Sequence, residues 1–442
     1  MDNSVLSRKT GWRKVCRFAI ALAALFCCYR LILDSAKAGV SRLFSTAAII
    51  QSRIEPADTA IRLTPNDPEA HYTRALALIN KERLVEAVGE LHESTRLRPH
   101  HYYEWLDLGV TLDRVGDRPG ADAALRKSIS LAPSFAQPHW QLGSMLYRDA
   151  QYPEAFKELR KGAASNPDLM TGLLQLAWVA GNEDVSAFLS IAQPSDVKTH
   201  LEAAQFLATQ SKGEASVAQV REAGEVTSDE ERRLVKQTIR LLLSAQEFAA
   251  AFETWKLSHS ALAKNIEKEQ IVNGDFLDPI PLDDPGFGWQ LQSNPAVSVA
   301  IDTYGPNPGT RSLRIEYAGD NSPSTPLVNQ LILLQPGKRY SLSFMAKADN
   351  LVSGGRPVVV ALTANGNPPK ILGESDPLSM RGDEWSRYTF PFATDEVSGG
   401  IFVSLQRQQC TQVPCPIFGK LWLSKFSISR ADQTEITNVS KK

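Results

Sequence analysis

The chain of 442 residues has almost no net charge. Its 48 Lys+Arg and 49 Asp+Glu give a formal net charge of −1, so no global field draws it toward nucleic acid or another strongly charged polymer. Hydrophobic residues (43%) and charged residues (22%) lie near the averages of globular domains, which excludes bulk disorder and a polytopic membrane protein. At about 150 residues per domain, this length predicts two or three domains.

Cysteines are also few. Three of the five lie in or beside an N-terminal apolar run, and only Cys410 and Cys415 fall in a region that is expected to fold. Their C-x4-C spacing, with Pro414 and Pro416 on either side of Cys415, favours a disulfide in an oxidising compartment, with free thiols or a metal site as alternatives. Zinc would need two further ligands, and all seven histidines lie far away, between His71 and His259. We expect a disulfide, no metal and no cofactor.

The sequence lacks a catalytic motif that we can recognise. No histidine follows His259, so a Ser/His/Asp arrangement would have to span two domains. The adjacent carboxylates Asp283 and Asp284 precede a proline, as solvated turn residues do, and no glycine-rich phosphate loop occurs. The regions described below leave no segment long enough for a catalytic domain. We therefore expect that the protein is not an enzyme.

Charge is uneven at the N-terminus. Five basic residues between Arg8 and Arg17 precede the apolar run 18–33, which only Arg30 interrupts. Arg17 and Arg30 can snorkel and extend the usable span, so residues 1–40 predict a cytoplasmic basic flank and a signal-anchor helix at about 16–33. The alternative is a signal peptide, cleaved after the small-x-small sequence 36–38, and a secreted protein. In both cases the bulk is exported, to a periplasmic or other extracytoplasmic space.

A repeat of 34 residues follows. Pro65, Pro99, Pro133 and Pro167 are evenly spaced, and small residues recur where paired helices would touch. Clear units are 68–101, 102–135 and 136–169. They resemble the tetratricopeptide repeat (TPR), which implies an all-α solenoid over 41–265 that ends in degenerate pairs at 170–265.

The TPR resemblance implies a concave groove that binds a protein partner. Aromatic anchors and two arginines that could hold a carboxylate occupy its expected positions. The alternative is an ordinary amphipathic surface. The groove residues that this resemblance implies are Tyr72, Asn80, Tyr103, Asp113, Arg114, Trp140, Tyr147 and Arg148.

From residue 266 the hydrophobic period changes from 3.6 to 2. Short alternating runs separated by Gly- and Pro-rich turns predict an all-β sandwich or jelly roll over 266–432, followed by a tail at 433–442. The complete chain is thus a multidomain α plus β protein. The expected strands are 297–304, 311–317, 328–334, 339–347, 358–363, 385–392, 401–406 and 421–429.

Several motifs of this second region resemble a carbohydrate-binding module of the galactose-binding-like jelly-roll type. They include Val272-Asn273-Gly274-Asp275-Phe276, Gly288-Trp289 and Glu384-Trp385-Ser386-Arg387-Tyr388. The chain departs from the family at the residues that often help to hold a calcium ion, because the last strand reads Leu423-Ser424-Lys425 where the family often has an aspartate. Sugar stacking would need exposed aromatic rings, and core packing is the alternative role for Trp289 and Trp385. The candidates are Trp289, Tyr304, Trp385 and Phe402.

These observations predict an exported adaptor that is anchored in a membrane. Its solenoid would bind a protein, and its sandwich would bind glycan. Pairing of these modules suggests a role in bacterial cell-envelope polysaccharide biogenesis or export. The alternatives are a purely structural interaction scaffold whose sandwich binds no glycan, and an accessory subunit of an envelope enzyme.

Overall fold

The computed structural model describes residues 4–259, 266–292, 294–319, 326–366, 368–382, 384–395, 399–410 and 414–431, with side chains from Arg17 onward. The predicted tail at 433–442 lies outside these residues. Contacts divide the chain into two compact units, Met1–Gln193 and Pro194–Lys442. The last helices of the region predicted as one solenoid therefore share a unit with the sandwich.

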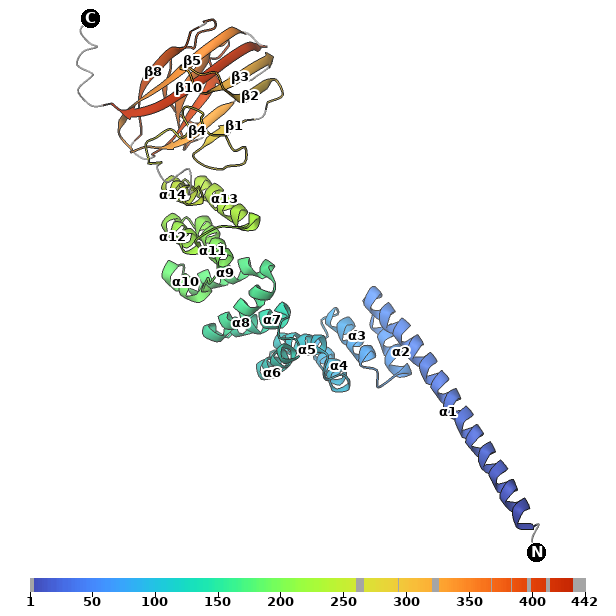
Figure 1. The fold of residues 1–442 in the computed structure, drawn as a ribbon. Coiled ribbons are helices and arrows are strands. Elements are labelled where there is room, and N and C mark those ends of the chain that lie inside the picture. Colours follow the sequence, from blue (N-terminus) through green and yellow to red (C-terminus); the bar gives the residue numbers. More distant parts are fainter. Residues whose placement is uncertain are drawn as a thin grey trace, which may run out of the picture. The chain divides into compact units, whose positions relative to one another are not determined.

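The first unit is built of antiparallel helix pairs (Figure 1). The three clear repeats form α3 (Pro68–Ile79) with α4 (Leu84–Leu97), α5 (Tyr102–Val115) with α6 (Arg118–Leu131), and α7 (Ala136–Arg148) with α8 (Tyr152–Ser165). A short 3-10 turn, η1 (Pro167–Leu169), leads into α9 (Met170–Ala180) and α10 (Val185–Ala192). Prolines at or near helix starts, where the missing N–H is not needed, help to set these boundaries.

Close approach within each pair explains the recurring glycines. A Cβ on Gly109 would lie 2.6 Å from Cγ of Leu125, and one on Gly143 would lie 2.7 Å from Cγ of Leu159. Both leucines are buried one repeat apart in the layer between helices. The 34-residue pattern thus reports real packing positions, and the TPR-type architecture is confirmed.

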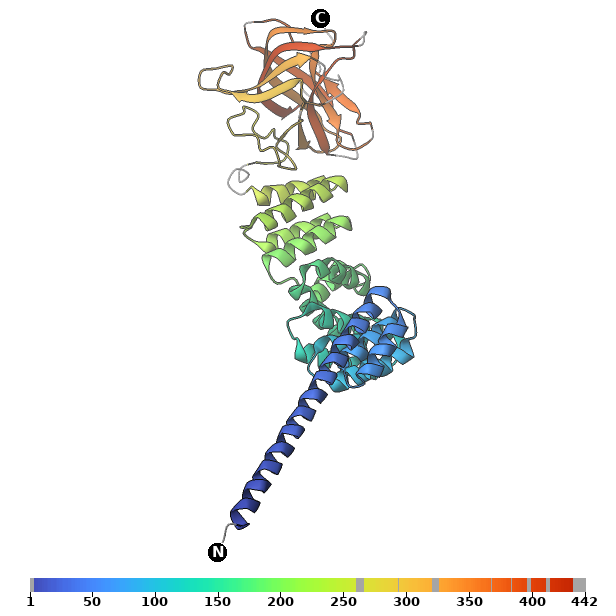
Figure 2. The same cartoon turned by 90° about the vertical axis from the view of Figure 1, so that its right-hand side faces the viewer.

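The N-terminal helix α1 (Ser4–Gln51) continues without a break from the apolar run into the helical array. Its C-terminal part packs against α2 (Ile54–Leu63) and α3, and Ser41, Ser45 and Ala48 are buried there. Ser41 Oγ donates to the carbonyl of Ala60 at 3.1 Å. Helix α1 therefore supplies both the apolar segment and the first helix of the array, as Figure 2 shows in blue.

In the second unit, the repeat pattern resumes after an interruption. Helix α11 (Val197–Thr209) pairs with α12 (Gly213–Ala223), and α13 (Asp229–Ser244) pairs with α14 (Phe248–Ser258). Ser216 Oγ of α12 donates to the carbonyl of Ala204 in α11 at 2.8 Å, so small residues again face each other. The pair α9–α10 is shorter than the pairs before it, so the next repeat does not begin 34 residues later. The 34-residue pattern in the sequence is therefore lost after Pro167.

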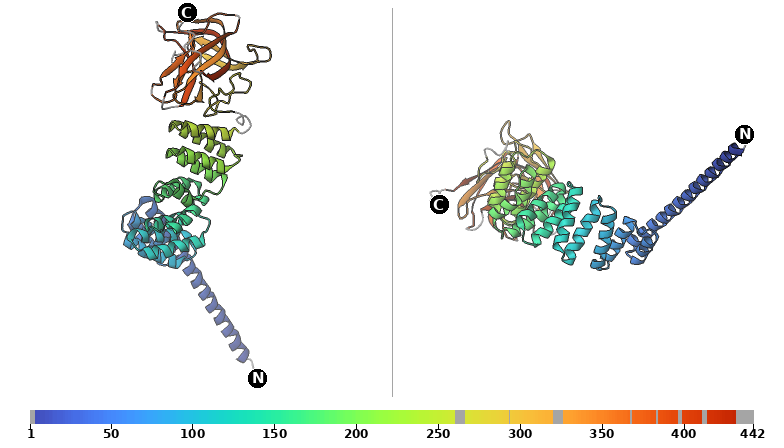
Figure 3. Two further views of the ribbon diagram at one scale, coloured as in Figure 1. Left: turned by 90° about the vertical axis from the view of Figure 1, so that its left-hand side faces the viewer. Right: turned by 90° about the horizontal axis from the view of Figure 1, so that it is seen from below.

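The sandwich consists of two five-stranded antiparallel sheets, which Figure 3 shows in yellow to red. Sheet A has the order β1-β4-β9-β6-β7, and sheet B has the order β2-β3-β10-β5-β8. The strands of sheet A are β1 (Trp289–Leu291), β4 (Val328–Leu333), β9 (Gly400–Arg407), β6 (Pro357–Thr363) and β7 (Ile371–Glu374). Those of sheet B are β2 (Val297–Asp302), β3 (Ser312–Gly319), β10 (Ile417–Arg430), β5 (Arg339–Ser353) and β8 (Ser386–Ala393).

All eight strands expected from alternation are present, and the sandwich is confirmed. Alternate residues such as Tyr340, Leu342 and Phe344 fill the core between the sheets, as the period of two requires. Two further strands, β1 and β7, are too short to show an alternating pattern.

One face of sheet A is covered by the helices of its own unit. Leu331 and Phe402, which point away from the sandwich core, pack in a cluster with Phe252 and Trp255 of α14. Trp255 Nε1 donates to Asp284 Oδ2 at 3.0 Å, and a Cβ on Gly286 (φ +136°) would lie 2.7 Å from the Trp255 ring. The helices α11–α14 and the sandwich therefore share a hydrophobic core.

Candidate functional site

The predicted groove residues of the first unit lie on successive repeats, and contacts between repeats hold several of them. Tyr72 is half-buried, and its hydroxyl donates to Asp107 Oδ2 at 2.6 Å. Burial raises the pKa of both groups, and the hydrogen bond from Tyr72 opposes the rise at Asp107. Asn80 is exposed at the end of α3. Tyr103 is 49% exposed and stacks on Tyr102 with ring centroids 4.1 Å apart.

The two arginines of the predicted groove are already paired with carboxylates. Arg114 Nη2 donates to Glu82 Oε2 at 2.9 Å, which joins neighbouring repeats. Arg148 is ion-paired with Asp113, which also contacts Arg118. A carboxylate ligand would therefore share these exposed guanidinium groups with Glu82 and Asp113, or compete with them.

The remaining two groove candidates are partly used in packing. Trp140 is half-buried, and a Cβ on Gly172 would lie 3.1 Å from its ring, so α9 covers part of it. Tyr147 meets Phe156 edge-on at 5.8 Å. Exposed polar and aromatic groups at Asn80, Tyr103 and the arginines thus form the accessible part of the predicted set.

The structure brings two of the four sugar-binding candidates together on the outer face of sheet B. Tyr304 is 47% exposed, and its ring is stacked with that of Trp385 at a centroid distance of 6.1 Å. Trp422 of β10 meets Tyr304 edge-on at 6.5 Å. We call Tyr304, Trp385 and Trp422 the aromatic patch.

Polar groups border the aromatic patch. Lys347 Nζ lies 4.8 Å from the Tyr304 ring centroid and donates to the Tyr304 hydroxyl at 2.9 Å. Asp302 Oδ2 accepts from Trp422 Nε1 at 3.1 Å. Strand register sets this arrangement, because Trp422 of β10 lies opposite Lys347 of β5 and Arg314 of β3, and residues directly opposite one another share a face.

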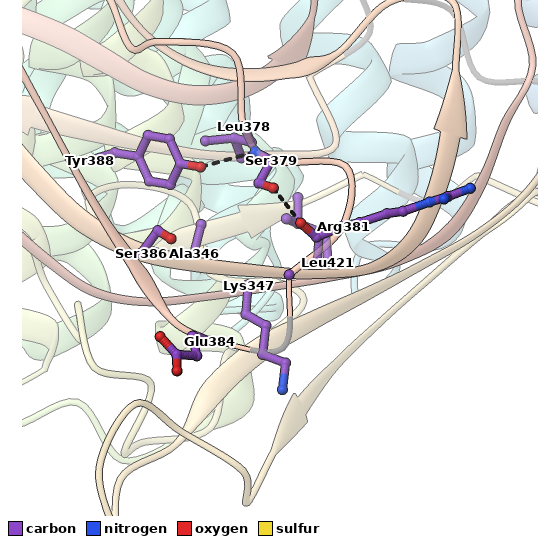
Figure 4. Close-up of a pocket in the computed structure, with 11 residues that line it drawn as sticks. Ala346, Lys347, Leu378, Ser379, Arg381, Glu384, Ser386, Tyr388 and Leu421 are labelled. Carbon is purple, nitrogen blue, oxygen red and sulfur yellow. Dashed lines mark hydrogen bonds between the residues drawn. The ribbon is translucent and has the colours of Figure 1, made fainter.

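A pocket of about 290 Å³ adjoins the patch at Lys347 (Figure 4). Leu378, Leu421 and Glu384 are among the residues that line it, whereas the side chain of Arg381 points away from the other lining residues. Inside it, the Tyr388 hydroxyl accepts from the Ser379 amide at 2.9 Å and keeps its own proton free to donate. Aromatic rings beside hydroxyl, ammonium and carboxylate groups can contact both the apolar face and the hydroxyl groups of a sugar.

The other two sugar candidates have different surroundings. Trp289 is 3% exposed and donates from Nε1 to the carbonyl of Asn273 at 3.0 Å, so it is a core residue, as the alternative allowed. Phe402 does point away from the sandwich core, as alternation predicts, but the helices of its own unit pack against it. Trp289 therefore offers no face to a sugar, and Phe402 is half-buried by protein.

Sequence reasoning missed Trp422, Lys347 and Asp302. The signal was available, because Trp422 stands between the inward residues Leu421 and Leu423, and alternation places it on the outer face. A tryptophan on the polar face of a strand is the feature to search for. Lys347 and Asp302 come from distant strands, so their place beside it required the sheet order.

Cys410 and Cys415 are joined by a disulfide in the described structure. The buried Arg407 lies against it, and its Nη2 donates to the Cys415 carbonyl at 3.0 Å. Among the described residues there is no group of three or more His, Cys, Asp or Glu side chains that could hold a metal ion. Lys425 lines a second pocket of about 470 Å³ with Asn273 and Asp275.

A family model described as a carbohydrate binding domain matches residues 268–403. No curated protein matches the chain. Similar solved structures include one described as CBM4 (23% identity, 36% of this chain and 99% of that chain, TM-score 0.28). Another is MamA from Desulfovibrio magneticus RS-1 (18% identity, 45% of this chain and 96% of that chain, TM-score 0.29). A third is YrrB, described as a TPR protein with an unusual peptide-binding site (16% identity, 36% of this chain and 85% of that chain, TM-score 0.29). The chain thus joins TPR-like helices to a sandwich that resembles carbohydrate-binding domains.

Proposed function

We propose that this protein is an exported, membrane-anchored adaptor without enzymatic activity. Its helical repeats bind a protein partner, and its sandwich binds glycan through the aromatic patch. The setting we propose is a bacterial cell envelope, where the helices dock onto a complex that makes or exports a polysaccharide and the sandwich contacts the polymer.

The aromatic patch is the observation that carries the glycan proposal. Tyr304 presents nearly half of its surface to solvent, and the Trp385 indole lies beside it. Amphipathic rings with polar neighbours bind ligands that have both apolar faces and hydroxyl groups, as a pyranose has. The adjoining pocket adds Glu384 and the Tyr388 hydroxyl as hydrogen-bonding groups.

The covered face of sheet A favours this location. The cluster that contains Leu331 and Phe402 is filled by helix α14, so the flat apolar surface over these strands is already occupied by protein. The outer face of sheet B is therefore the side of the sandwich on which the described structure leaves aromatic rings accessible.

The N-terminal helix supports anchoring and export. One helical segment, Arg17–Gln51, is long and apolar enough to cross a membrane, with a mean hydropathy of 1.8 in its best window. Basic residues between Arg8 and Arg17 precede it, and a cytoplasmic location of such a flank would place everything after the helix outside. The alternative is a cleaved leader and a secreted protein.

The glycan proposal is tested by binding of the full-length protein in detergent to immobilised envelope polysaccharides. Tyr304→Ala and Trp385→Ala should each cost about 1–2 kcal/mol, a weakening of about 5- to 30-fold. Tyr103→Ala is the matched control, because Tyr103 is 49% exposed but lies on the helical array. Absence of binding to every envelope glycan, or equal binding by the Tyr304 variant, would favour a purely structural scaffold or an accessory subunit of an envelope enzyme.

A further inference from the structure

Helix α1 is much longer than a membrane is thick. Its 48 residues extend about 72 Å at 1.5 Å per residue, whereas the hydrocarbon core of a bilayer is about 30 Å thick. The apolar run ends at Leu33, and Asp34 and Lys37 follow it. The rest of the helix, to Gln51, therefore lies outside the hydrocarbon.

The outer part of α1 has two unlike faces. Ser41, Ser45 and Ala48 are buried against α2 and α3. On another side of the same turns, Leu43 is 72% exposed and Ile50 is 77% exposed. Leu43 and Ile50 belong to a row of exposed residues that also includes Gly39 and Thr46, and its apolar members indicate a surface that binds something.

The exposed row has the spacing of a coiled coil. Starting at Phe18, its positions alternate by four and three residues, which is the heptad pattern, and it continues without a break from the apolar run into the outer part of the helix. We call this row the seam. Its members are Phe18, Leu22, Leu25, Tyr29, Ile32, Ala36, Gly39, Leu43, Thr46 and Ile50.

We infer that the seam joins two copies of this chain as a parallel coiled-coil dimer. Because each copy has the same seam, the two helices match in register, with Leu43 against Leu43 and Ile50 against Ile50. Parallel orientation follows from the proposed anchoring of both copies in one membrane. A Cβ added to Gly39 would meet no atom within 4 Å, so a second helix has room to approach there.

The positions of the charged residues favour a second copy of the chain, rather than lipid, as the partner that covers the seam. Asp34, Lys37 and Arg42 place charges on the outer part of α1, and charged side chains do not readily enter hydrocarbon. None of the three belongs to the seam. Of the heptad positions that flank the seam, 33, 35, 40, 42, 47 and 49, only Arg42 is charged, and in a parallel dimer it faces Ala47 of the second copy.

A dimer would have a direct consequence for binding. Two aromatic patches on one particle engage a repeating polymer with an effective concentration that a single patch lacks. This consequence depends on the proposed glycan function, whereas the dimer itself depends only on α1 and on its proposed anchoring in a membrane. The two proposals can therefore fail separately.

Cysteine cross-linking in membranes tests the dimer. In the full-length protein with Cys16, Cys27 and Cys28 replaced by Ser, Leu43→Cys and Ile50→Cys should form disulfide-linked dimers on mild oxidation, because facing seam positions lie within disulfide reach. Lys37→Cys, which is exposed on the same helix but outside the seam, is the control and should stay monomeric.

A second variant measures association without cross-linking. Leu43→Asp should convert the dimer into monomers by light scattering in detergent, whereas Lys37→Asp should leave the mass at that of two chains. Because Leu43 is exposed, its replacement leaves the core of the array intact. A monomeric wild type, or equal cross-linking at positions 37 and 43, would overturn the dimer. Quenching of a fluorophore at position 43 by lipid-borne quenchers would assign the seam to the membrane instead and also overturn it.

Discussion

His71 Nδ1 lies 2.6 Å from Glu90 Oε2, and the other ring nitrogen of His71 bonds to the carbonyl of Pro65 at 2.8 Å. Two repeats later, His139 makes the same two contacts, to Glu158 and to the Pro133 carbonyl. The histidine thus ties the two helices of its repeat together and holds the preceding proline turn.

The His71–Glu90 pair predicts that stability falls above neutral pH. The hydrogen bond to Glu90 raises the pKa of His71 in the folded protein. Protonated His71 therefore stabilises the fold fully below its unfolded pKa of about 6.5, and this stabilisation is lost as the pH rises through the pKa of the folded state. Burial raises the pKa of Glu90, but the hydrogen bond from His71 and the charge of Arg74 outweigh it, so the net shift is downward. The contribution of Glu90 is therefore lost only in acid.

We expect the free energy of unfolding to fall by about 1–2 kcal/mol as the pH rises above about 6.5, measured by thermal unfolding. His71→Gln should reduce this dependence. His92→Gln, at an exposed histidine of the same repeat, should not. An unchanged profile in the His71 variant would contradict the assignment.

Trp255 is predicted to be essential for the second unit. It is 3% exposed, and Trp255→Ala should lower the free energy of unfolding by about 3–5 kcal/mol. Trp255→Phe keeps much of the packing but leaves Asp284 without this donor, so a smaller loss of about 1–3 kcal/mol is expected. Leu282→Ala, at a side chain 84% exposed, is the control. In chemical unfolding of the Trp255→Ala variant, the unfolding midpoints of the helices and of the sandwich in this unit should fall together. A lower midpoint for one of them alone would contradict the shared core.

The arginines of the array are predicted to serve binding rather than folding. Arg114→Ala and Arg148→Ala remove exposed ion pairs, which contribute about 0–1 kcal/mol each, so the unfolding midpoint should change little. Capture of the protein partner by the double variant should weaken, measured by co-purification after cross-linking in membranes. Lys127→Ala is a control on the same array. If the wild type, the double variant and the Lys127→Ala variant all co-purify equal amounts of partner, the two arginines do not belong to the binding groove.

Reduction of the Cys410–Cys415 disulfide is predicted to destabilise the sandwich moderately. The bridge closes a short loop, for which the chain-entropy estimate is about 2 kcal/mol. Cys410→Ser with Cys415→Ser should reproduce the effect of a reducing agent in thermal unfolding. If reductant lowers the midpoint of the double variant as well, the effect comes from elsewhere.

Local patterns in the sequence predicted most of the fold, and non-local contacts account for what they missed. The proline spacing marked the helix pairs because each Pro stands at a turn, and alternation marked eight strands because each buries one face. Alternation also placed Phe402 on an outer face correctly. Helix α14 covers Phe402 in the structure, although the two are far apart in the sequence. Neither the helical period of 3.6 nor the strand period of 2 predicts such a contact.

The binding residues show the same limit. Tyr304 and Trp385 were candidates as single aromatics, but only the order of strands in sheet B places them beside Trp422 and Lys347. Likewise, the sequence marked Arg148 as a residue that could hold a ligand carboxylate, but the carboxylate it contacts in the structure is that of Asp113 from the preceding repeat.

Delivery of both binding regions across a membrane is the central claim, and the location of the C-terminus tests it most directly. Alkaline phosphatase, which is active only after export, should be active when fused after Lys442. The same enzyme fused after Arg13, before the apolar run, should be inactive. An inactive C-terminal fusion, with the full-length protein present, would place the sandwich inside the cell and contradict the proposed role at the envelope.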